Sequence, residues 1–183
     1  FDCLVGSEMC IRDRINGFIL ASAYALPISI LGYSYGYLVI PLFIDDVLTT
    51  PIAVSYFSIS SIGIFFNALS FVFQGFYTGI EKTKIHLNVT IASNVINAYL
   101  NAGLIYGKQG LVNVLGLEKT SLFDFSNLWF WADFEGMGVS GAAIGTLISS
   151  IWMMLHYFYY LNKHVLIHIQ VYKLVLMELV QNN

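Results

Sequence analysis

The sequence predicts an all-α integral membrane protein with four transmembrane helices. Of its 183 residues, 57% are hydrophobic and only 10% are charged, and the mean hydropathy is +0.72. A soluble domain carries about 25% charged residues. The charges are also segregated, because residues 15–44, 47–80, 85–107 and 136–162 contain no Asp, Glu, Lys or Arg. Each stretch holds at least the roughly 20 residues that a helix needs to cross a bilayer, so we expect a multi-pass protein.

The first two spans contain residues that shape helices and their contacts. Pro27 and Pro41 in the first span, and Pro51 near the start of the second, lack a backbone donor and favour a bend or a helix end. Gly32 and Gly36 have the spacing that lets another helix approach closely. We expect this pair to serve ordinary packing within the chain, in preference to a dimer interface.

The third span carries a polar stripe. At about 100° per residue, Asn94, Asn97 and Asn101 join Thr90 within an arc of roughly 60°. Carboxamides are costly against hydrocarbon, because lipid satisfies none of their donors and acceptors. We therefore expect the stripe to face protein or a wet cavity, either as a functional site or as hydrogen bonds between helices.

Other polar side chains in the spans are weaker candidates. Asn67 and Gln74 are seven residues apart on the second span, so they share a face and are candidates to line a cavity, although packing explains them equally well. His86 is expected at the membrane interface, in preference to a proton relay. His156 is expected on a lipid-facing surface, in preference to an aromatic and Met-rich surface that binds amphipathic cations.

The basic residues set the expected orientation. One side of the four crossings receives six of them (Arg12, Arg14, Lys82, Lys84, Lys163 and Lys173), and the other side only Lys108 and Lys119. Basic residues accumulate on the cytoplasmic side, so the first span runs outward and the loop 108–135 is extracytoplasmic. Its aromatic residues suit a segment at the level of the lipid headgroups, with a small lid as the alternative (Phe123, Phe125, Trp129, Phe130, Trp131 and Phe134).

Both ends of the chain stand apart from the spans. Residues 1–14, which include both cysteines, lack the pattern of a helix or a signal peptide and resemble a translated sequencing adapter, so we regard them as non-native. Without Arg12 and Arg14, the basic residues still favour the same orientation by four to two. Residues 163–183 form an amphipathic tail, which is either an interfacial helix or the approach to a further span. We therefore expect the chain to be a fragment.

Four blocks of sequence point to a family. They are Gly-Ile-Glu-Lys-Thr-Lys at residues 79–84, Asn-Ala-Tyr-Leu-Asn at 97–101, Gly-Leu-Ile-Tyr-Gly at 103–107 and Gly-Met-Gly-Val-Ser-Gly-Ala-Ala-Ile-Gly-Thr at 136–146. In this order and spacing, they resemble the multidrug and toxic compound extrusion (MATE) family of cation-coupled antiporters over residues 15–162. The similarity is to the third to sixth helices of the family's N-terminal six-helix lobe.

The resemblance implies a twelve-helix exporter of the plasma (inner) membrane, in which two six-helix lobes enclose a cavity. Organic cations or other amphipathic xenobiotics would leave in exchange for sodium ions or protons, with no further cofactor. In many members, a first-helix carboxylate, an Asn-x-x-x-Asp/Asn pair on the fifth helix and a Thr on the sixth form a polar site. The matching positions are Asn97, Asn101 and Thr146, whereas the first helix has no counterpart here. Amide oxygens are ligands for a hard cation, but a proton would need the missing carboxylate, because Asn does not titrate.

Three alternatives remain, of which the first comes from the same superfamily. A lipid-linked oligosaccharide flippase shares the two-lobe plan, but its phosphate-linked substrate requires a cationic cavity, and no Lys or Arg lies inside the four spans. A membrane structural subunit is the second alternative. A membrane-embedded enzyme is disfavoured, because the spans lack carboxylates, cysteines and clustered histidines for metal binding or acid–base work.

The composition also bounds the partners. A net charge of −3 without a basic stripe gives no support for nucleic-acid binding. The expected partners are membrane lipids, a small-molecule substrate and the remaining helices of the full-length transporter.

Overall fold

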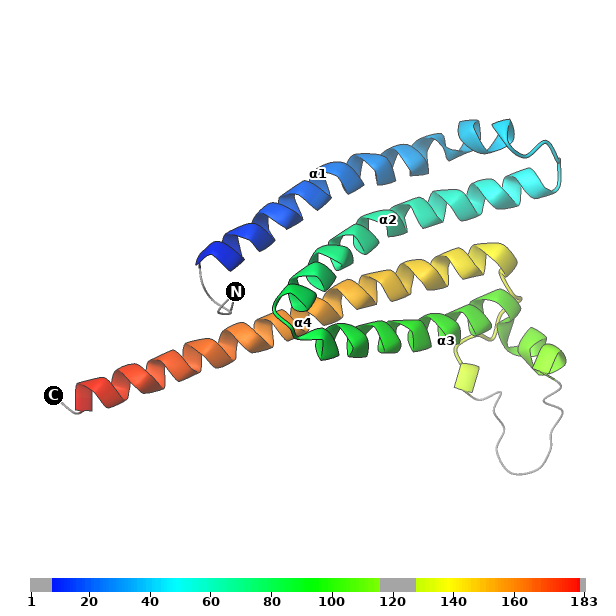
Figure 1. Ribbon diagram of the computed structural model, residues 1–183. Helices are drawn as coiled ribbons and strands as arrows, with labels where there is room; N and C mark the ends of the chain where they lie inside the picture. Colours follow the sequence, from blue (N-terminus) through cyan, green and yellow to red (C-terminus); the bar gives the residue numbers. More distant parts are fainter. Residues whose placement is uncertain (1–7, 116–127, 182–183) are drawn as a thin grey trace, which may run out of the picture.

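Four long helices, each antiparallel to the one before it, make up the structure (Figure 1). The computed structural model describes residues 8–115 and 128–181, with the backbone alone for residues 8–11, 13, 14, 115 and 164–181. The helices are α1 (Glu8–Val39), α2 (Thr49–Gly79), α3 (Thr83–Leu115) and α4 (Gly138–Gln181), and a short 3-10 helix, η1 (Ile40–Leu42), follows α1. The described residues contain no strand. The predicted all-α fold with four helices is confirmed.

The helices lie side by side in the order α1, α2, α4, α3 (Figure 1). α1 packs mainly on α2, whereas α4 packs extensively on both α2 and α3. α2 and α3 are consecutive in the sequence but make few direct contacts. α4 therefore holds the two halves of the bundle together.

Three of the four helices are long and apolar enough to cross a membrane: Ile15–Leu42, Thr49–Gly79 and Gly138–Lys163. α3, the third predicted span, is long enough but too polar to meet the same criterion of length and composition. The reason is the four asparagines between residues 85 and 107, which lower its mean hydropathy. Because α3 packs along α4, much of this polar surface meets protein.

The Gly32 and Gly36 pair packs α1 against α2. A Cβ added to Gly32 would lie 2.5 Å from the Ser61 hydroxyl oxygen, and one added to Gly36 would lie 2.9 Å from the Phe57 ring. Side chains at these positions would push the two helices apart. The predicted role in packing within the chain is confirmed.

A buried aromatic cluster joins all four helices near the α2–α3 turn. The ring of Tyr157 on α4 stacks on Phe73 and Tyr77 of α2, with centroid distances of 5.6 and 5.8 Å. Val89 of α3 is buried in the same cluster. Phe18 of α1 meets Phe73 edge to face, with the centroids 4.7 Å apart.

The α2–α3 turn ends α2 in a Schellman motif. The Lys82 N–H donates to the Tyr77 carbonyl at 2.9 Å, and the Glu81 N–H donates to the Thr78 carbonyl at 3.1 Å. Glu81 has φ 58°, the left-handed conformation that this motif requires and that glycine usually supplies. Backbone hydrogen bonds therefore define the turn, although a glutamate occupies its left-handed position.

Several predicted boundaries are wrong. α1 begins at Glu8, so residues 8–14 are helical although no helix is predicted there. α3 continues into the predicted loop 108–135 as far as Leu115. α4 begins at Gly138 and continues to Gln181, so the tail has a helical backbone up to that residue, and its place at the membrane interface or before a further span stays a prediction. Charged residues indicate where a chain leaves the apolar interior of the membrane. They do not end a helix, because a helix ends where its backbone hydrogen bonds are interrupted. Pro41 does this after α1, where it lies within η1.

α3 changes direction at Gly107, which has φ 66° and ψ 172°. A Cβ at this position would lie 2.3 Å from the Phe134 carbonyl oxygen. The segment 131–137 runs back along this end of α3, and the Lys108 N–H donates to the Ala132 carbonyl at 2.8 Å. Both the backbone conformation and the close approach therefore require glycine.

Replacing Gly107 with alanine is expected to destabilise the protein by about 1–3 kcal/mol, because the left-handed conformation strains a residue with a side chain. Thermal unfolding in detergent micelles, followed by tryptophan fluorescence, measures the loss. Gly75→Ala is the control, since no atom lies within 4 Å of the added Cβ. Equal stability of the two variants would contradict the role of Gly107.

Asp46 caps the start of α2. Its carboxylate accepts the Thr49 N–H at 2.8 Å and also the Thr49 hydroxyl. The hydroxyl hydrogen bond, followed by the backbone one, lowers the pKa of this exposed carboxyl from its usual 3.8. The folded-state pKa is therefore below the unfolded one, so the cap is complete at neutral pH. Its contribution is lost as the pH falls through the lowered pKa.

Thr49→Val is expected to raise the Asp46 pKa toward its usual value, because the hydroxyl hydrogen bond that lowers it most is removed. Carboxyl ¹³C NMR during a pH titration in micelles measures the pKa. Thr50→Val is the matched control, since the Thr50 hydroxyl donates to the Ile44 carbonyl at 3.0 Å. The assignment fails if Asp46 titrates identically in the wild type and Thr49→Val.

Candidate functional site

Small residues of α4 allow a close contact with α3. A Cβ on Gly141 would lie 2.5 Å from the Leu104 carbonyl oxygen, and one on Gly145 would lie 2.1 Å from Asn101 Oδ1. Only glycine permits backbones to approach this closely. The approach brings the polar stripe of α3 within hydrogen-bonding distance of α4.

Asn97 links the two helices. Its NH₂ group donates to Ser149 Oγ at 3.0 Å and to Thr146 Oγ1 at 3.3 Å. Its carbonyl oxygen accepts a hydrogen bond from the NH₂ group of Asn101 at 3.0 Å. Asn97 and Asn101 are half-buried, whereas Thr146 is exposed at the edge of the contact. The structure therefore brings together the predicted residues Asn97, Asn101 and Thr146.

Asn101 ends this chain of hydrogen bonds with a free acceptor. Its Oδ1 is one of two buried side-chain polar atoms without a partner in the described part of the chain, the other being Nδ1 of His156. A buried acceptor without a donor is costly. An oxygen of this kind is also a suitable ligand for a hard cation or for an N–H or O–H donor.

Polar contacts continue along α3 toward the α2–α3 turn. Ser93 donates to the Ser149 carbonyl at 3.2 Å. Nδ1 of His86 lies 2.6 Å from the Tyr157 hydroxyl and 3.3 Å from the Thr90 hydroxyl. His86 is thus half-buried against α4, and its prediction as a membrane-interface residue missed this contact.

The other predicted polar residues lie outside this network. Asn94 is exposed on α3, and Asn67 and Gln74 are half-buried on α2, which makes few contacts with α3. Asn94 and Asn97 lie at opposite edges of the shared arc, about 60° apart at roughly 100° per residue. Asn97 turns toward α4, whereas Asn94 turns to the open side of α3.

Sequence reasoning missed Ser149 and Gly145 as parts of the site. Ser149 lies three residues after Thr146, so helical spacing alone places both on one side of α4. Gly145 lies in the family-like sequence block at residues 136–146, but nothing in that block distinguishes it from the other glycines there. Their contacts with α3 depend on how far one helix is shifted along the other, which the sequence of either helix does not contain.

Aromatic residues attach the segment before α4 to α3. The indole N–H of Trp129 donates to the Tyr99 carbonyl at 2.9 Å, and that of Trp131 donates to the Tyr99 hydroxyl at 2.7 Å. These two tryptophans therefore pack on protein, whereas Phe130 is 75% exposed and remains a candidate for headgroup contact. Two predicted aromatic residues lie outside the described residues (Phe123 and Phe125).

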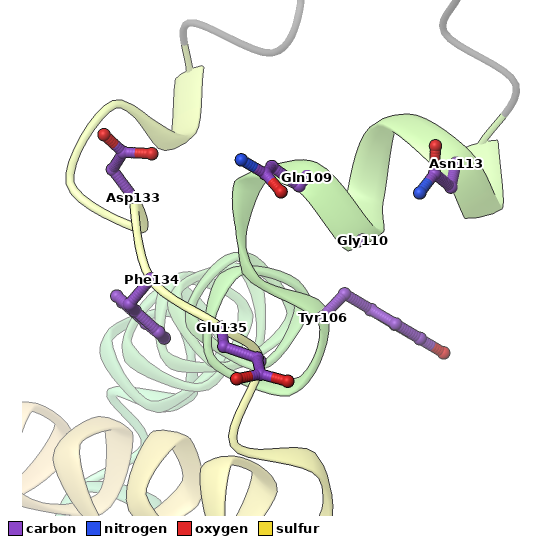
Figure 2. A pocket seen from close by; sticks show the side chains of 8 residues that line it. Tyr106, Gln109, Gly110, Asn113, Asp133, Phe134 and Glu135 are labelled. Atoms are coloured by element: carbon purple, nitrogen blue, oxygen red, sulfur yellow. The ribbon is translucent and has the colours of Figure 1, made fainter.

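A cavity of about 590 Å³ opens beside the Gly107 bend, and its lining comes from both sides of that bend (Tyr106, Gln109, Gly110, Asn113, Asp133, Phe134, Glu135 and Gly136). Figure 2 shows Asp133 on the segment before α4 and Gln109 on the part of α3 beyond the bend. A smaller cavity of about 270 Å³ has an almost wholly apolar lining from α1 and α2. Neither is lined by the predicted candidates, so their role in a cavity stays a prediction (Asn67, Gln74, Thr90 and Asn94).

Comparison with known protein families matches residues 15–102 to the family MatE. The match covers α1 from Ile15 onward, all of α2 and the part of α3 that carries the asparagine stripe. Thr146 and Ser149 lie beyond the matched residues. No curated protein and no solved structure matches the chain.

Gly145→Ala is expected to destabilise the protein by about 1–3 kcal/mol, the usual effect of overpacking a close contact. The added methyl group occupies the position of Asn101 Oδ1 and pushes α3 from α4. Unfolding in detergent measures this loss. Gly63→Ala is the matched control on α2, because its added Cβ would meet only Leu147, at 4.0 Å.

A double-mutant cycle identifies the cause. Asn101→Ala removes the atoms that the new methyl group meets, so the double variant should lose less stability than the two single variants together. Strict additivity would show that Gly145 acts through another contact.

Proposed function

We propose, from the premise that residues 15–102 belong to the MATE family of membrane transporters, that the chain is part of a cation-coupled antiporter. The antiporter exports organic cations or other amphipathic xenobiotics across the plasma (inner) membrane, in exchange for sodium ions or protons. The four helices correspond to the third to sixth helices of a six-helix lobe. The remaining helices of the transporter and membrane lipids cover their open faces.

The observation that carries this proposal is the link between the asparagine pair and α4. Asn97 is hydrogen-bonded to Asn101 and to Thr146, so three side chains with neutral oxygen atoms converge between two helices. No Asp, Glu, Lys or Arg lies in the stretches that supply them, residues 85–107 and 136–162. Neutral oxygen ligands suit a monovalent cation that must be both bound and released.

The same residues bear on the choice of coupling ion. Asparagine does not titrate, so the pair alone offers ligands to sodium but no site to carry a proton. Proton coupling requires a titratable group, such as the first-helix carboxylate found in many family members. Both ions therefore enter the experimental test.

Exposed polar residues support neighbours beside α3 and α4. Asn94 and Thr146 are exposed on these four helices, and lipid leaves such groups unsatisfied. Further helices or the water-filled cavity of a complete transporter would satisfy them. A flippase for phosphate-linked oligosaccharides is less well supported, because the spans carry no basic residue to hold the phosphate.

Alanine at Asn97, Asn101 or Thr146 is expected to reduce ethidium efflux by the full-length transporter about tenfold, the order seen when an ion site loses ligand support. Efflux is measured in cells that lack their own exporters, under separate sodium and proton gradients. The gradient that drives wild-type efflux identifies the coupling ion.

Asn88→Ala is the control for a change of carboxamide on α3. Asn88 is exposed and lies about 180° around the helix from Asn97. Its variant should keep wild-type efflux. Wild-type coupling in all three site variants would reduce Asn97, Asn101 and Thr146 to packing residues.

A further inference from the structure

The two hydroxyl groups beside Asn97 already donate their protons elsewhere. The Thr146 hydroxyl donates to the Ala142 carbonyl at 2.9 Å, and the Ser149 hydroxyl donates to the Thr146 carbonyl at 2.9 Å. A hydroxyl group has one proton and can accept through its lone pairs. Toward Asn97, both groups therefore act as acceptors.

This arrangement orients both asparagine amides. Asn97 must turn its NH₂ group to the two hydroxyls, which leaves its carbonyl oxygen directed at Asn101. Asn101 must then turn its own NH₂ group to that oxygen. What remains free at the end of the chain is Oδ1 of Asn101, an acceptor without a donor.

We infer that Ser149 is a positioning residue, which sets the direction of the amide pair so that Asn101 presents its carbonyl oxygen and not its NH₂ group. This inference rests on the cation site proposed above and deepens it. A site that ends in an acceptor takes a cation or a hydrogen-bond donor, and it disfavours an anion. Reversal of the two amides would present NH₂ and reverse that preference.

Ser149 is the stronger of the two acceptors for Asn97. Its Oγ lies 3.0 Å from the Asn97 nitrogen, against 3.3 Å for Thr146. Ser149 is also 4% exposed, whereas Thr146 is exposed, so little water competes for its hydrogen bond. Burial of this kind makes a hydrogen bond more costly to lose.

Gly145 completes the arrangement on the ligand side. The free oxygen of Asn101 is buried against it, in the space that a Cβ would fill. For a ligand to reach this oxygen, the α3–α4 contact would have to open at Gly145. Ser149 acts one turn further along α4, so it orients the amides without contacting the ligand.

Ser150 provides a matched control. It is 4% exposed, as Ser149 is, and its hydroxyl donates to the same Thr146 carbonyl at 2.9 Å. Asn97 donates to Ser149, however, and not to Ser150. Ser149→Ala and Ser150→Ala therefore remove the same hydroxyl and the same bond to the backbone, and only the first removes an acceptor for Asn97.

The test uses the full-length transporter of the efflux assay in detergent micelles, with ¹⁵N- and ¹³C-labelled asparagine. NMR records the side-chain amide signals of Asn97 and Asn101, first without sodium and then during addition of sodium chloride. The wild type and Ser150→Ala are expected to show one set of signals. Ser149→Ala is expected to show a second set, because the Asn97 amide can turn over. The sodium concentration at half-maximal shift should rise about five- to tenfold, the loss expected for one hydrogen bond.

Two further variants keep the test decisive. Ser149→Thr retains the hydroxyl and should restore the wild-type signals. Ser149→Cys retains the shape but offers only a weak acceptor, so it should behave as Ser149→Ala does even if alanine disturbs folding. Circular dichroism checks that all variants remain helical.

The outcomes separate this inference from the proposed function. Identical amide signals in Ser149→Ala and Ser150→Ala overturn the role of Ser149. A second set of signals in Ser149→Ala, together with a wild type that does not respond to sodium, supports the positioning role and contradicts sodium binding at the site. A sodium response that weakens only in Ser149→Ala and Ser149→Cys supports both.

Discussion

A carboxamide inside an apolar span must find its hydrogen-bond partners within the protein, and here that requirement holds α3 against α4. Asn97 meets it through the hydroxyl groups of Thr146 and Ser149 on one side and through Asn101 on the other. These bonds form only because Gly141 and Gly145 let the helices approach. The close packing of α3 on α4 and the hydrogen bonds of the asparagine side chains therefore depend on each other.

The position of α4 follows from this dependence. It packs on α3 through the polar contact and on α2 through an aromatic one, in which Tyr157 stacks on Phe73 and Tyr77. Midway along α3, at the level of the asparagine pair, Trp129 and Trp131 hold the segment before α4 to Tyr99. One aromatic contact therefore lies level with the asparagine pair, and the other lies toward the α2–α3 turn. These contacts keep the hydrogen-bonded side chains in place, whereas Thr146 is exposed at the outer edge of the contact.

How far prediction from the sequence succeeded can be judged on particular residues. The charge-free stretches identified four helices, and the Gly32 and Gly36 spacing identified a packing contact, because both depend on residues close in the sequence. The spacing of Asn97 and Asn101 identified a polar face, but it placed Asn94 on the same face and did not distinguish it from them. The structure separates them, since Asn97 meets α4 and Asn94 does not. Sequence-based boundaries failed where charge was taken to end a helix: α1 continues past Arg14 to Glu8, and α3 continues past Lys108 to Leu115.

The sequence by itself determined the membrane class, the number of helices and the presence of an unusual polar stripe. Hydropathy and helical periodicity are properties of one segment at a time, so they can be read without knowing its neighbours. Only the tertiary structure decided that Ser149 and Gly145 belong to the site and that Asn101 ends it with a free oxygen. These facts depend on the register and distance between two helices about 50 residues apart in the chain, which side-chain packing across the whole contact sets.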